Sequence, residues 1–114
     1  MSVSYFVRYE ISPRDPQAFL DHYRTVHVPI LARWPGMRRV VLHTNLPARD
    51  PMSTQPGGAF LLAQLEFESQ ADLEAAFASP ERVEARRDFH AFPPFEGTVT
   101  HQAMLSEEAW RRDL

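Results

Sequence analysis

Residues 19–36 read FLDHYRTVHVPILARWPG, and the rest of the chain is organised around this stretch. At about 100° per residue, its large apolar side chains fall on one face of a helix, with His27 near the centre of the apolar stripe. The pattern therefore predicts an amphipathic helix that carries a histidine into an apolar interior. The residues on this face are Phe19, Tyr23, His27, Ile30, Leu31 and Trp34.

A proline interrupts this helix one turn before its end. Pro29 has no N–H and its ring crowds the carbonyl of Thr25, so we expect the helix to bend or restart just past His27 and to stop at the Pro-Gly pair at 35–36. His22 lies well off the apolar stripe. It is five residues from His27, whereas two metal ligands on one helix face are four apart. The spacing predicts that the two histidines do not form a pair, and it gives no metal site.

The start of the chain predicts a strand followed by this helix. Residues 3–10 alternate between two faces, as a strand does when one of its faces is buried. Asp15 before Pro16 marks the beginning of the helix, because a residue before proline is held extended and proline suits the first helical position. Ser69, and Ser79 with the proline that follows it, predict two further short helices.

The element order predicts the fold. Three further strands are expected, at residues 37–46, 59–67 and 98–105. With the two short helices taken as one split helical unit, the order is β-α-β-β-α-β. This order is typical of the ferredoxin-like α+β fold, with an antiparallel four-stranded sheet and helices on one face. At 114 residues, we interpret the whole chain, 1–114, as one domain.

The third expected strand, AFLLAQLEF at 59–67, has apolar residues on both faces. Phe60 and Leu62 point one way, and the remaining apolar residues point the other way. Helices cover only one face of such a sheet, so the other face requires a partner. A homodimer that packs sheet on sheet meets this requirement most simply.

The sequence leaves one question open for each of two segments. The proline- and glycine-rich stretch at 47–58 is a loop, longer than a hairpin requires, which either shields a pocket or is a plain surface excursion. Residues 106–114 form a charged tail, and the sequence leaves open whether it is helical.

Composition excludes several classes of function. The net charge is −3, and all 12 basic residues are arginines scattered along the chain, so we expect no nucleic-acid partner. The absence of cysteine excludes disulfides, thiolate nucleophiles and thiolate metal sites. No stretch reaches membrane-spanning length and the first ten residues do not resemble a signal peptide, which predicts a cytoplasmic protein without a membrane partner.

The aromatic, histidine and proline residues of the first helix together resemble the signature of the EthD family. The residues that carry the resemblance are Phe19, His22, Tyr23, His27, Pro29, Ile30, Pro35 and Gly36. The resemblance extends from the first strand to the last and implies a member of the dimeric α/β-barrel superfamily. It also implies a homodimer whose two sheets form a barrel, with a small-molecule cavity in each subunit between helices and sheet.

Relatives in this family include methylmuconolactone isomerases and fungal polyketide dehydratases and decarboxylases. In the isomerases, a histidine at the position that matches His27 is the acid-base residue. Their second-strand tyrosine corresponds by position to Val40 here, and their cysteine has no counterpart. The resemblance thus implies histidine chemistry in an apolar cavity rather than that particular isomerisation.

These considerations select the candidate site residues. We expect His27 to be buried, with no carboxylate close by, a pKa below its usual value and an acid-base role. The residues expected to bind substrate around it are Tyr23, Trp34, His90, Phe95 and His101, of which His101 lies on a strand whose face the sequence leaves open. His43 is expected on the dimer side of the sheet, and the arginine pairs at 38–39 and 86–87 on solvated faces. The sequence offers no convincing pair of carboxylates for glycosidase chemistry.

Three classes of function remain. The first is a cofactor-independent isomerase, dehydratase, decarboxylase or cyclase that acts on a small lactone, phenolic or polyketide-like substrate, with His27 moving protons. The second is a cofactorless or haem-using oxygenase of the same superfamily. The third is a non-catalytic dimer that binds a small hydrophobic or aromatic ligand.

Overall fold

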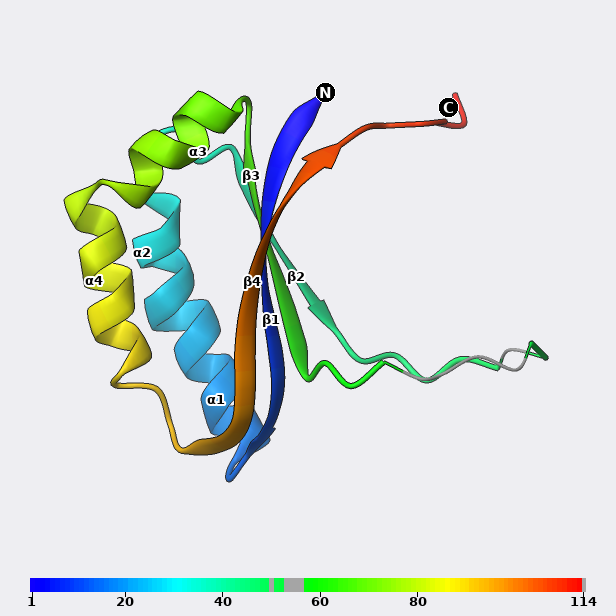
Figure 1. Ribbon diagram of the computed structural model, residues 1–114. Coiled ribbons are helices and arrows are strands. Elements are labelled where there is room, and N and C mark those ends of the chain that lie inside the picture. The colour runs from blue at the N-terminus through cyan, green and yellow to red at the C-terminus, as the bar shows by residue number, and fades with distance from the viewer. Residues whose placement is uncertain (50, 53–56, 114) are drawn as a thin grey trace.

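The chain forms one antiparallel four-stranded sheet with every helix on the same face (Figure 1). This computed structural model describes residues 1–49, 51–52 and 57–113. The strands lie in the order β2-β3-β1-β4, which confirms the ferredoxin-like α+β fold. The elements are β1 (Ser2–Pro13), α1 (Pro16–His22), the π-helical segment η1 (Tyr23–His27), α2 (Val28–Ala32), β2 (Arg39–Thr44), β3 (Leu61–Phe67), α3 (Gln70–Phe77), α4 (Pro80–Phe89) and β4 (Phe95–Ser106).

The strand ends differ from the sequence-based expectation in all four strands, and the change in β4 adds pairing to the sheet. This strand pairs with the whole of β1, from Phe95 opposite Pro13 to residue 106 opposite residue 2, although the sequence-based expectation begins it only at residue 98. Gly97 has φ +127°, and a Cβ there would lie 2.3 Å from the carbonyl oxygen of Glu10. Gly97, which lies before the expected start of the strand, thus permits the close approach of β4 to β1.

The expected helix starts are confirmed by their capping hydrogen bonds. The Asp15 carboxylate accepts from the backbone N–H of residue 18 at 3.0 Å, and Pro16 follows at the first helical position. The hydroxyls of Ser69 and Ser79 accept from the backbone N–H groups three residues later. These bonds satisfy donors that every helix leaves free at its first turn.

The interruption expected at Pro29 is confirmed, and it takes the form of a π-helical segment. The backbone N–H of Val28, the first residue of α2, donates to the carbonyl of Tyr23, five residues back. Because the proline has no N–H to donate, the regular bonding pattern cannot pass through it. The Thr25 hydroxyl donates to the carbonyl of Asp21 at 2.6 Å within the same interruption.

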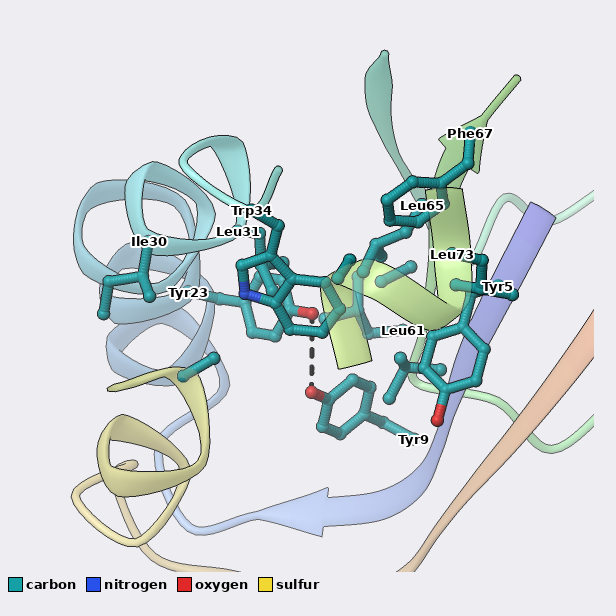
Figure 2. Close-up of a cluster of buried hydrophobic side chains, with 14 of the residues drawn as sticks. Tyr5, Tyr9, Tyr23, Ile30, Leu31, Trp34, Leu61, Leu65, Phe67 and Leu73 are labelled. Atoms are coloured by element: carbon teal, nitrogen blue, oxygen red, sulfur yellow. Dashed lines mark hydrogen bonds between the residues drawn. The ribbon is translucent and has the colours of Figure 1, made fainter. Parts of the chain in front are cut away.

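The core lies between the sheet and the helices (Figure 2). All six residues of the predicted apolar stripe are buried, including His27 at 6% exposure. Alternate side chains of β1 and β3 meet them from the sheet. These core strand residues are Val3, Tyr5, Val7, Tyr9, Ile11, Leu61, Ala63, Leu65 and Phe67.

The expectation that the third strand is apolar on both faces is wrong for the side away from the helices. There Leu62 alternates with Gln64 and Glu66, whereas Phe60 precedes the strand and packs on the ring of Phe19. This uncovered side, which we call the open face, is therefore of mixed polarity. It carries a shallow hollow of about 250 Å³, lined by the apolar side chains of Phe6, Leu62 and Met104 together with polar and charged residues.

Residues 107–113 have neither helix nor strand, which settles the open question of the tail for these positions. The loop expected at 47–58 falls partly outside the described residues, at 50 and 53–56. Within the parts of the chain that the structure describes, no helix has the length and apolar character to cross a membrane.

Candidate functional site

A cavity of about 200 Å³ lies between the sheet and the helices, beside the π-helical segment. Strands β1 and β4 and helix α4 contribute most of its walls, and the rest comes from η1, α2, β3 and the residues that directly follow α2 and α4. The lining residues are Tyr5, Val7, Tyr9, Tyr23, His27, Leu31, Trp34, Leu65, Arg82, Ala85, Arg86, Phe89, His90, Val99 and His101.

The structure brings most of the predicted site residues to this one cavity. His27 and four of the expected substrate-binding residues line it, namely Tyr23, Trp34, His90 and His101. His101 pairs with Val7 and stacks on Tyr5, which places it on the helix side of the sheet. Phe95 does not line the cavity, because its ring packs against Phe19 and Phe89. His43 lies on the open face and contacts Gln64 at 3.2 Å.

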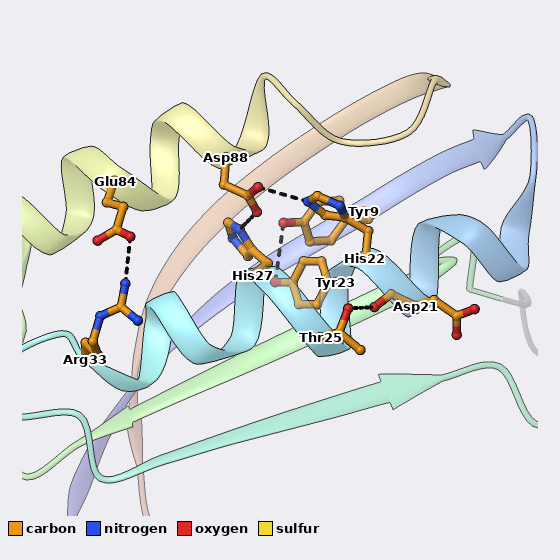
Figure 3. A network of polar contacts seen from close by, with 9 residues as sticks. All are labelled: Tyr9, Asp21, His22, Tyr23, Thr25, His27, Arg33, Glu84 and Asp88. Atoms are coloured by element: carbon orange, nitrogen blue, oxygen red, sulfur yellow. Dashed lines mark hydrogen bonds and ion pairs between the residues drawn. The ribbon is translucent and has the colours of Figure 1, made fainter.

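A carboxylate whose side chain is 10% exposed links the two histidines of the first helix (Figure 3). Asp88 Oδ2 lies 2.8 Å from His27 Nδ1, and Asp88 Oδ1 lies 2.9 Å from His22 Nε2. Two expectations are therefore wrong: His27 does have a carboxylate beside it, and the two histidines do share a partner. We call this arrangement the His-Asp-His clamp.

The π-helical segment explains why His22 and His27 face the same carboxylate. In an α-helix, residues five apart point about 140° away from each other. The i→i+5 hydrogen bonds of η1 widen the turn and bring such residues toward one side. Asp88 itself gives only a weak signal in the sequence. It lies four residues after Glu84, which bonds Arg33 at 2.6 Å, so both acids face the first helix.

Burial and Asp88 act in opposite directions on His27. The pKa of His27 lies below its usual value, as expected, because burial disfavours the imidazolium more strongly than Asp88 favours it. The charge of nearby His22 also lowers this pKa. The ring is packed between aromatic rings, with Phe92 at 4.8 Å and Tyr23 at 4.9 Å between centroids. A mainly neutral imidazole at pH 7 follows.

Two tyrosine hydroxyls lie beside this imidazole. The Tyr9 and Tyr23 hydroxyl oxygens are 3.4 Å apart and buried (Figure 2). Burial raises the pKa of Tyr9 to about 12 and that of Tyr23 well above its usual value, so both hydroxyls keep their protons. Nε1 of Trp34, also in the cavity wall, is buried without a hydrogen-bond partner in the described chain. The cavity therefore offers hydrogen-bond donors close to a neutral base.

Two basic residues of α4 complete the lining. Arg82 and Arg86 both border the cavity, while Arg86 and Arg87 are both exposed, as expected for a pair on a solvated face. Only Arg87 has no part in the lining. Within residues 1–49, 51–52 and 57–113, no group of three or more histidine and acidic side chains is arranged to hold a metal ion.

Comparison with known proteins identifies the family. Residues 12–93 match the model of the EthD domain. The chain is also 40% identical over 80 residues to an uncharacterized 11.0 kDa protein encoded in the thcB-thcC intergenic region of Rhodococcus erythropolis, covering 70% of this chain and 74% of that protein. The chain belongs to the EthD family. The site of this EthD protein is thus built on the helix that carries the family resemblance.

Solved structures share the fold over nearly their whole length. An EthD family protein of Bacillus halodurans has a TM-score of 0.75 at 23% identity, covering 94% of this chain and all of that one. A hydroxynitrile lyase from Passiflora edulis has a TM-score of 0.69 at 18% identity, over 96% and 97% of the two chains. SnoaB, a cofactor-independent oxygenase from Streptomyces nogalater, has a TM-score of 0.62 at 17% identity, over 97% and 98%.

Proposed function

We propose that this EthD protein is a cofactor-independent enzyme that moves a proton on a small organic molecule, with His27 as the acid-base residue. The observation that carries the proposal is the hydrogen bond of 2.8 Å between His27 Nδ1 and Asp88 Oδ2, in a ring that lines the cavity. A carboxylate accepts, so Nδ1 carries the proton of the neutral ring. Nε2, which no described residue bonds, is then the free base.

The surroundings of His27 suit this role. The depressed pKa leaves the ring neutral and able to accept a proton at pH 7. Once the imidazolium has formed, the carboxylate of Asp88 stabilises its charge and holds the ring in one orientation. His22 on the other carboxylate oxygen fixes Asp88 in turn, so we assign positioning roles to both.

The hydroxyls of Tyr9 and Tyr23 supply the complementary function. When His27 Nε2 removes a proton from a carbon next to a carbonyl, the electron pair of the C–H bond moves to the carbonyl oxygen. Protonated tyrosines donate hydrogen bonds to that developing anion, as does the unpartnered N–H of Trp34. Return of the proton to another carbon gives isomerisation, and transfer to a departing hydroxyl gives dehydration.

An oxygenase is the second candidate, since a cofactor-independent oxygenase shares this fold at a TM-score of 0.62. The same base produces the electron-rich enolate or phenolate that such an enzyme requires. The two candidates differ in whether turnover consumes oxygen. A protein that only binds a ligand differs from both enzymes, because it catalyses no reaction for which His27 is required.

The test is proton exchange, which requires no knowledge of the natural substrate. Small lactones, cyclic ketones and phenols are incubated with the protein in D2O, and exchange at carbon is followed by NMR with oxygen uptake measured in parallel. We expect His27→Gln to slow exchange by about a hundred- to ten-thousand-fold. His43→Gln, on the open face, is the matched control and should exchange like the wild type. Equal exchange by wild type and His27→Gln contradicts the proposal.

We further propose that a second copy of the chain covers the open face. Phe6, Leu62 and Met104 contribute apolar surface to its hollow, and Met104 is 46% exposed, so covering this face removes that apolar surface from water. Light scattering should give about twice the chain mass of 13.1 kDa. Leu62→Asp in the hollow should give a monomer, whereas Val83→Asp, on the outer side of α4, should leave the dimer intact. A wild-type monomer contradicts this proposal.

A further inference from the structure

One face of α4 presents two arginines to the cavity. Arg82, Ala85, Arg86 and Phe89 are spaced at i, i+3, i+4 and i+7, which places them in one row on the helix, and all four line the cavity. Like charges four residues apart on a helix disfavour each other. The arrangement therefore costs stability unless an anion lies between the two guanidinium groups.

No acidic group of the described chain compensates these charges. Among the described residues that line the cavity, none is aspartate or glutamate. Elsewhere, five arginines form ion pairs with glutamates, namely Arg8, Arg33, Arg38, Arg39 and Arg111. Arg82 and Arg86 form none within the described ranges. Asp88, on the same helix, has both oxygens engaged by the two histidines of the clamp.

The two charges act on the cavity itself. The guanidinium carbon of Arg82 lies 4.3 Å from the centre of the Phe77 ring, a cation–π contact that holds this side chain in place. Burial lowers the pKa of His101, and the positive charges of Arg82 and Arg86 lower it further; the same two charges oppose the rise that burial causes in the pKa of Tyr5. The two arginines thus act on the part of the cavity at Tyr5 and His101, whereas of the His-Asp-His clamp only His27 lines the cavity.

We propose that Arg82 and Arg86 form an anion subsite that binds the carboxylate of a single-ring carboxylic acid. The planar fork of a guanidinium matches a carboxylate with two parallel hydrogen bonds. Val7, Leu65 and Val99 supply apolar walls for the ring. A volume of about 200 Å³ lies below the ~300–1,000 Å³ of pockets for larger ligands, which restricts the ligand to about one ring. One part of this inference rests on the proposed function, namely that the bound acid turns a reacting carbon toward His27.

Calorimetric titration with acids and their amides tests the subsite. The probes are benzoate and phenylacetate, compared with benzamide and phenylacetamide, which have nearly the same shape without the charge. We expect the wild type to bind the acids roughly ten- to a hundred-fold more tightly than the amides. Arg86→Gln should remove most of that difference while leaving amide binding unchanged. Arg87→Gln, an exposed neighbour on α4 outside the cavity, is the matched control and should bind like the wild type.

Several outcomes overturn the inference. One is equal binding of acids and amides by the wild type, and another is an equal loss in Arg87→Gln and Arg86→Gln, which indicates long-range attraction only. Arg82→Gln also removes the contact with Phe77, so Arg82→Lys, which keeps the charge, should retain more acid binding than Arg82→Gln. If the wild type does not prefer acids to amides but its proton exchange still depends on His27, only the subsite is refuted. If it prefers acids but its proton exchange does not depend on His27, only the proposed function is refuted.

Discussion

Replacement of Asp88 by asparagine tests the His-Asp-His clamp directly. Asp88 accepts hydrogen bonds from His27 and His22 at 2.8 and 2.9 Å, and its side chain is only 10% exposed. A hydrogen bond to a charged group contributes about 1.5–3 kcal/mol. The amide oxygen of Asp88→Asn still accepts one neutral bond, but its NH2 group faces the second histidine donor. We therefore expect a loss of about 2–4 kcal/mol in the free energy of unfolding.

The measurement is urea unfolding at pH 7.5 and fixed protein concentration, because subunit association makes apparent stability depend on concentration. Glu84→Gln is the matched control. Glu84 joins the same two helices through Arg33, but its side chain is 44% exposed, so its loss should cost about 0–1 kcal/mol. NMR titration adds a second measure, since loss of the Asp88 charge should lower the pKa of His27 further. Equal destabilisation by both variants, or a raised His27 pKa in Asp88→Asn, refutes the clamp.

Three further predictions concern pH, the helix interruption and the β1–β4 pairing. Because the folded state lowers the pKa of His27, the unfolded chain binds more protons, and the stability this group contributes is present above about pH 6.5 and lost as the pH falls below it. Urea unfolding at pH 7.5 and 5.5 should show a smaller loss in His27→Gln than in the wild type, and an equal loss contradicts the assignment. Pro29→Ala restores a backbone donor and should straighten the first helix and move His27; a crystal structure with an unmoved ring shows that the interruption is incidental. Gly97→Ala places a Cβ 2.3 Å from the carbonyl oxygen of Glu10 at φ +127° and should lower the free energy of unfolding by more than about 1 kcal/mol. Gly58→Ala is the control and should be nearly neutral, because no atom lies within 4 Å of its Cβ. Equal melting temperatures for the two variants count against this close approach of the strands.

Local patterns in the sequence determined the helices, their starts and the burial of His27. Asp15, Ser69 and Ser79 begin helices because a capping side chain needs only the backbone N–H groups that follow it within a few residues. The apolar stripe around His27 fixes which side of the first helix faces the sheet, because burial of large apolar side chains dominates the packing of a short helix. The order of strands and helices along the chain also predicted the sheet topology.

Only the tertiary structure decided how the site is composed. Asp88 meets His27 and His22 across 61 and 66 residues of sequence, so no local pattern pairs them. A helical wheel also assumes a constant turn, and the π-helical segment changes that turn between the two histidines. The cavity position of Arg86 depends on how α4 packs over the sheet, which its own sequence does not specify. The sequence by itself determined that a histidine is buried; long-range packing decided which groups surround it and hence what chemistry it can perform.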